Sequence, residues 1–156
     1  MDPAGQIFTS VRQRIDALAE EILRFLDNKQ QLSGRRDLPE TLRAERIRAS
    51  RERLTAQMDS AFGYGSDSLR VRISQIAERA GERGAEAVLA SRCAEIWTEE
   101  LPGLRRFLEY CAGLIEAHRG PVTPEMRDSH ICLLQAEVVM TGIAARVEKE
   151  TGTGPD

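Results

Sequence analysis

The stretch 131–147 reads ICLLQAEVVMTGIAARV and is the most apolar run in this chain of 156 residues. Plainly polar side chains interrupt it only at Gln135, Glu137, Thr141 and Arg146. On a helix, the apolar residues of this run cover almost the whole circumference, and such a helix must be surrounded by other elements. The run is also shorter than the roughly 20 apolar residues of a membrane span. We therefore expect this stretch to form the central helix of the fold.

Helical periodicity covers most of the remaining chain. The pair Asp2 and Pro3 is typical of a helix start, and apolar residues then recur every three or four positions as far as Leu26. A loop is expected over 27–37, because that stretch has no apolar period and contains a Ser-Gly pair. A helix starting at 69 should end at the Leu-Pro-Gly sequence of 101–103. Other helices are expected over 39–62, 104–118 and 123–150.

Two glycines, Gly81 and Gly84, predict either a kink or short break, or a continuous helix that a neighbour approaches closely. No stretch alternates with a period of two for long enough to predict a strand. The expected fold is an all-α, single-domain bundle of five or six helices with a central C-terminal helix. Residues 1–150 should form this bundle, and residues 151–156 should be a disordered tail.

Composition limits the classes of function. The chain contains 22 basic and 25 acidic side chains, giving a net charge of −3, which is untypical of a general nucleic-acid binder. Cys93, Cys111 and Cys132 lie within helical patterns, and we expect buried thiols in a reducing compartment. The N-terminal residues lack the positive charge and apolar core of a signal peptide. These features predict a cytoplasmic protein without a membrane partner.

The usual signatures of catalysis and metal binding are missing from the sequence. Neither His118 nor His130 follows a glutamate by three residues, the spacing by which helical di-iron proteins bind metal. The glycines precede no Lys-Ser or Lys-Thr pair of the kind that cradles phosphate, and no flanking motif indicates an activated cysteine. We expect a protein that is not an enzyme, with no catalytic residue, no metal and no cofactor.

Glu137 is the most unusual residue of the apolar stretch. A carboxylate among apolar side chains must be protonated, paired with a cation, or turned toward the edge of the bundle. Arg51 is the candidate partner, because it falls within the thin apolar stripe of the helix expected over 39–62. A buried Arg51–Glu137 ion pair is one hypothesis, and a Glu137 at the edge of the bundle is the other.

Arginines on and around the same helix are the main functional lead. They could bind a nucleic-acid backbone or another partner through guanidinium groups, and the candidate contacts are Arg35, Arg36, Arg43, Arg46, Arg53, Arg70 and Arg72. The competing interpretation is a solvated surface on which Glu40, Glu45 and Glu52 form helical ion pairs with them. Aromatic residues are scarce here, so base stacking should contribute little.

The segment 104–120, LRRFLEYCAGLIEAHRG, resembles a helix of the small helical subunits of CRISPR effector complexes. The resemblance implies a non-catalytic subunit of an antiviral-defence ribonucleoprotein that contacts DNA or RNA backbone. Our leading hypothesis is a helical small subunit or adaptor of a larger assembly, with other protein subunits as partners. One alternative is a purely protein-protein scaffold or regulatory bundle. The other is a small-molecule sensor with a pocket lined by Met58, Met126 and Met140.

Overall fold

The computed structural model describes residues 2–82, 84, 87–130 and 135–152. The described residues form helices and connecting turns, with no strand among them. The helices are α1 (Pro3–Ser33), α2 (Glu40–Phe62), α3 (Leu69–Gly81), α4 (Ala87–Ala117), α5 (Pro124–His130) and α6 (Ala136–Thr151). The prediction of an all-α bundle is confirmed.

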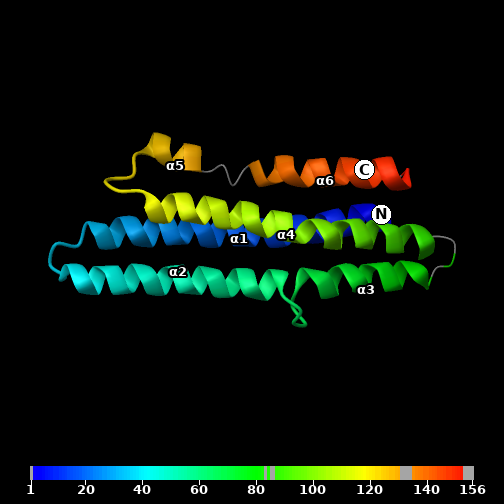
Figure 1. Ribbon diagram of the computed structural model, residues 1–156, viewed down its shortest axis with the longest axis horizontal. Coiled ribbons are helices and arrows are strands. Elements are labelled where there is room, and N and C mark those ends of the chain that lie inside the picture. Colours follow the sequence, from blue (N-terminus) through cyan, green and yellow to red (C-terminus); the bar gives the residue numbers. More distant parts are fainter. Residues whose placement is uncertain (1, 83, 85–86, 131–134, 153–156) are drawn as a thin grey trace.

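The two longest helices, α1 and α4, lie side by side through the centre of the bundle (Figure 1). Helices α2 and α3 follow one another along one side of this pair, and α5 and α6 follow one another along the other. Four rods result, two of them built from consecutive helices. Each rod runs antiparallel to the one before it in the chain, so α1 and α4 run parallel to each other. Because α1 and α4 contact both outer rods, the common core lies along them.

The C-terminal helix does not occupy the centre that we expected for it. Helix α6 packs on α4 and α1 through one stripe, while Val138 on its outer side is 70% exposed. Apart from Val138, the exposed positions of α6 carry small or polar residues, which gain little from burial, so one stripe suffices. Within the helix expected over 123–150, the described residues form α5, which ends at His130, and α6, which begins at Ala136. Its most apolar part, 131–134, lies outside the described residues.

Local signals correctly located several helix ends. Asp2 accepts a hydrogen bond from the Gly5 amide at 2.7 Å, so it caps α1 as expected, with Pro3 in the first turn. The glycine pair marks a break rather than a continuous helix, because α3 ends at Gly81 and Gly84 has a φ of +83°. Of the expected tail, Thr151 belongs to α6 and 153–156 lie outside the described residues.

Two predicted boundaries are wrong, and tertiary contacts explain both. Helix α1 continues through the expected loop to Ser33, because the Asn28 and Lys29 side chains bond to α2 and to the end of α4. Helix α4 runs through Pro102, which has no amide to donate. The proline lies on the exposed side of α4, while the core buries Leu101 and Leu104 before and after it. Packing on both sides of the proline thus keeps α4 in one piece.

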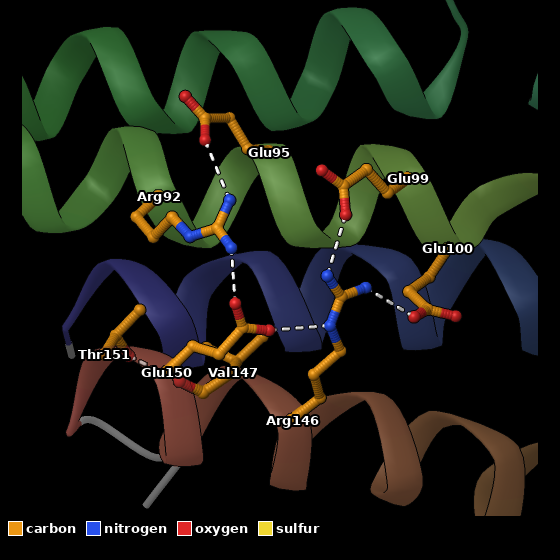
Figure 2. A network of polar contacts seen from close by, with 8 residues as sticks. All are labelled: Arg92, Glu95, Glu99, Glu100, Arg146, Val147, Glu150 and Thr151. Atoms are coloured by element: carbon orange, nitrogen blue, oxygen red, sulfur yellow. Dashed lines mark hydrogen bonds and ion pairs between the residues drawn. The ribbon is translucent and has the colours of Figure 1, made fainter.

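A charged network fastens α6 to α4 (Figure 2). The Arg146 guanidinium donates to Glu99, Glu100 and Glu150 at 2.8, 2.7 and 2.7 Å, and Arg92 bonds to Glu150 and Glu95. The hydrogen bonds from Arg146 and then Arg92 hold the pKa of Glu150 below its usual value. The three acids in turn raise the pKa of Arg146. Glu150 therefore joins two arginines on different helices.

The central pair can be tested at Trp97, which is 1% exposed and meets Phe8 of α1 edge to face at 6.1 Å between ring centroids. We expect Trp97→Ala to lower the free energy of unfolding by about 3–5 kcal/mol, because it opens a cavity between α1 and α4. Chemical denaturation would measure this loss of unfolding free energy. Val88→Ala, on the same helix at a side chain that is 84% exposed, should change stability little. Equal losses in both variants would contradict the packing described.

The network predicts a pH dependence. Since the folded pKa of Glu150 lies below its unfolded value, its stabilising effect is complete at neutral pH and is lost as pH falls through the folded pKa. Glu150→Gln should therefore lower the melting temperature at about pH 7, and this difference should shrink below about pH 4. Glu148→Gln, exposed on the same helix, is the matched control and should show no such convergence. A Glu150→Gln difference that stays constant with pH would contradict this role.

Candidate functional site: a basic groove beside α2

The predicted arginine strip does not form one surface. Helix α2 buries only Leu54, Met58, Ala61 and Phe62, so most of its circumference is open. At about 100° per residue, Arg46 and Arg53 lie on one flank of this stripe. Arg48 lies on the opposite flank and Arg51 within the stripe beside it, and both line the groove toward the end of α4. The α2 arginines thus serve two separate surfaces.

The other predicted contacts are also dispersed. Arg35 forms a two-bond pair with Asp37, which lowers the pKa of that carboxyl to about 2, and Arg43 is half-buried and donates to the Ser33 carbonyl. Arg36 is exposed at the turn before α2. Beyond the far end of α2, Arg70 stacks over Tyr64 and Arg72 donates to Ser10. The 23 residues of α2 span about 35 Å, so the arginines before and after it cannot act as one cluster.

The predicted buried pair between Arg51 and Glu137 is wrong. Arg51 donates from Nε to Glu116 of α4 at 2.8 Å, and its side chain is 23% exposed in the seam between α2 and α4. Glu137 pairs with Arg12 at 2.9 Å and is 56% exposed at the edge of the bundle. Arg51 does face a seam between helices, as its place in the apolar stripe indicated. Glu137 cannot reach it, because α6 packs on the other side of the central pair of α1 and α4. The alternative hypothesis for Glu137 is the correct one.

A groove with a volume of about 1000 Å³ opens between α2 and the end of α4. It exists because α2 packs mainly on α1, whereas α3 packs mainly on α4, so α2 stands off from the last turns of α4. The C-terminal turns of α1 and the segment 118–122 complete its walls. Its lining is Leu26, Lys29, Gln30, Ser33, Gly34, Arg36, Ala44, Ile47, Arg48, Arg51, Glu52, Thr55, Ile115, Glu116, His118, Arg119, Gly120, Pro121 and Val122.

The groove combines an apolar floor with a basic rim. Leu26 and Ile115 are buried at its base, and Ile47 and Val122 are half-buried beside them. Five basic side chains and two carboxylates, Glu52 and Glu116, line it. Arg36, Arg48 and Arg119 are exposed, so their charges remain accessible to an anion. This arrangement can bind a ligand that carries both an apolar part and a negative charge.

Lys29 shapes one wall of the groove. Its ammonium group donates to the carbonyls of Ile115, Glu116 and His118 at 2.6, 2.9 and 2.6 Å. These carbonyls lie at the end of α4, where that of Ile115 also accepts from the His118 amide and that of Glu116 from Arg119. A cation there also favours the helix dipole. Burial, followed by the neighbouring charge of Arg119, lowers the pKa of Lys29. The lysine therefore fixes the end of α4 and the turn after it.

Sequence reasoning missed the groove for a physical reason. Arg48 belongs to the arginine run, but Lys29 lies in a segment expected to be a loop, and Arg119 is distant in sequence. Only the packing of α1, α2 and α4 brings them together. The predicted methionine-lined pocket is not this groove. Met58 and Met140 are buried core residues that do not line it, and the Met126 side chain lies outside the described part.

Reactive cysteines, metal-binding clusters and membrane-spanning helices are further kinds of site that the described part of the chain could offer. There, Cys93 and Cys111 are buried in the core, and Cys132 lies outside the described residues. The described residues contain no group of three or more His, Cys, Asp or Glu side chains that could hold a metal ion. Among the described residues, no helix is both long enough and apolar enough to cross a bilayer. The groove is thus the main candidate that the described residues offer.

The role of Lys29 can be tested with the second lysine of the chain as control. Lys29→Met should lower the free energy of unfolding by about 1–3 kcal/mol, because it removes three hydrogen bonds at the end of α4, two of them part-buried. Hydrogen exchange should also accelerate in the last turn of α4. Lys149→Met, at an exposed position, should change neither quantity. Unchanged stability and exchange in Lys29→Met would show that the cap is dispensable.

Comparison with known proteins adds no assignment to this geometry. No protein-family model, curated protein or solved structure matches the chain. The predicted kinship with subunits of CRISPR effector complexes therefore remains a prediction. What the molecule does has to be argued from its own surfaces, of which the two flanks of α2 are the most distinctive.

Proposed function

We propose that this protein is a non-catalytic, cytoplasmic subunit or adaptor of a larger assembly, and that α2 contacts a nucleic-acid backbone. The contact surface is the flank that carries Arg46 and Arg53. The assembly is a ribonucleoprotein in this proposal, with other protein subunits as further partners. The buried thiols Cys93 and Cys111 agree with a reducing compartment.

The observation that carries the proposal is the unpaired charge of α2. Arg46, Arg48 and Arg53 are exposed, and no carboxylate among the described residues lies within ion-pair distance of them. Elsewhere, many arginines are paired, as Arg92, Arg105, Arg127 and Arg146 are. The helical ion pairs that would explain the α2 arginines as a solvated surface do not form in the described structure. Their guanidinium groups are therefore available to an external anion.

The geometry of this flank suits phosphate rather than bases. Arg46 and Arg53 are seven residues apart, which places them two turns, or about 10 Å, from each other on one side of α2. Guanidinium groups bind phosphate oxygens with two parallel hydrogen bonds. Tyr64 is the exposed aromatic ring nearest in sequence, and Arg70 already stacks on it. Stacking on bases would thus contribute little, and binding should depend weakly on sequence.

A salt titration with charge-reversed variants tests the proposal. We expect a labelled single-stranded RNA oligonucleotide to bind at low salt, with an affinity that falls steeply toward physiological salt as counterions are released. Arg46→Glu combined with Arg53→Glu should weaken binding at least about tenfold and flatten the salt dependence. The control is Arg79→Glu with Arg106→Glu, which makes the same charge change at exposed positions of α3 and α4.

Two outcomes would contradict the proposed contact. Equal losses in both double variants would mean that only net charge matters. The absence of any mobility shift at low salt would exclude the nucleic-acid contact and leave the adaptor with protein partners alone. Arg43 is avoided in this design, because its half-buried side chain packs at the start of α2 and its replacement would disturb the fold.

A further inference from the structure

The groove on the opposite flank of α2 has a feature that phosphate contact does not explain. The apolar residues of its lining that reach the surface are the half-buried Ile47 and Val122 and the exposed Ala44 and Pro121, above the fully buried Leu26 and Ile115. A nucleic-acid backbone presents no apolar group that would fill such a floor. Water in contact with these side chains is unfavourable, so a ligand with an apolar part would gain free energy by displacing it.

We propose that the groove binds an anionic amphiphile with one acyl chain and a carboxylate head group. The chain lies along the floor between α2 and the end of α4, and the carboxylate lies at the rim beside Arg48 and Arg119. This site is separate from the proposed nucleic-acid contact, because Arg46 and Arg53 lie on the other flank of α2. Failure of one proposal leaves the other intact.

Charge complementarity assigns the head group. The rim arginines Arg36, Arg48 and Arg119 are exposed, whereas Arg51 is occupied by Glu116 and Thr55. A carboxylate matches the fork of a guanidinium group, and the basic excess of the lining favours an anion over a neutral or cationic ligand. The Lys29 ammonium is turned to the α4 carbonyls, so it supports the wall instead of binding the head group.

The dimensions favour a single chain over a partner helix. A volume of about 1000 Å³ is at the upper end of the range of small-molecule pockets. The lining on α2 extends from Ala44 to Thr55, which is about 17 Å along the helix axis. The segment 118–122 lines one side and the end of α1 lines the base, so the apolar part of the lining is short. A docked protein segment would need a broader apolar surface, since stable interfaces bury about 800 Å² on each partner.

Calorimetric titration of the full chain with dodecanoate, below the concentration at which it forms micelles, tests the site. We expect saturable binding of one molecule per chain. Ala44→Trp should abolish it, because the indole ring fills the groove from an exposed position without touching the core. Ala56→Trp is the matched control, since Ala56 is exposed on the side of α2 away from the groove and should leave binding unchanged.

Two further ligands separate the contributions of the chain and the head group. Dodecanol keeps the chain but lacks the charge and should bind at least about tenfold more weakly. Acetate keeps the charge without the chain and should give no detectable heat. The proposal would be overturned if dodecanoate did not bind, or if its binding did not saturate. It would also be overturned if Ala44→Trp still bound dodecanoate, or if dodecanol bound as tightly as dodecanoate. RNA binding by Ala44→Trp should match the unsubstituted protein, which keeps the two proposals distinguishable.

Discussion

The packing of α1 against α4 is the interaction on which the rest of the structure depends. Both helices have 31 residues, and each buries an apolar stripe along most of its length. Because the two outer rods pack on this pair, neither needs to be apolar on more than one side. The same constraint explains why α4 stays helical through Pro102, since a break there would expose Leu101 and Leu104, which the core buries completely.

The two outer rods are held in different ways. Helix α6 combines an apolar stripe with the network in which Arg146 and Arg92 share Glu150, and α5 is tied to α1 by the pair of Arg127 with Asp27. Helix α2 has a thinner stripe, and its charged links to α4 are Arg51 with Glu116 and Asp59 with Arg105. A helix that buries so little is free to stand off from α4 at one end. The groove and the unpaired arginines both follow from this one property of α2.

The two flanks of α2 differ in chemistry although they belong to one helix. The flank with Arg46 and Arg53 offers charge without an apolar surface, which suits the proposed polyanion contact. The groove flank offers charge above an apolar floor, which suits the proposed amphiphile. Lys29 links the groove to the stability of the core, because the same ammonium group that forms its wall also satisfies the end of α4.

The sequence by itself determined the helical class, the cap at Asp2 and most of the apolar stripes, because these depend on spacing and on local backbone preferences. Near Gly81 and Gly84 it left a break and a continuous helix as alternatives, and the structure decided for the break. The sequence also identified the arginines of α2 as unusual. Only the tertiary structure decided which helices occupy the centre, that α1 continues to Ser33, and which carboxylate each arginine meets. The partners of Arg51 and Glu137 could not be inferred from a helical wheel, which gives the side of a helix but not the neighbour on that side. The groove is likewise a product of packing, since it depends on the distance between α2 and α4, and no local pattern encodes that distance.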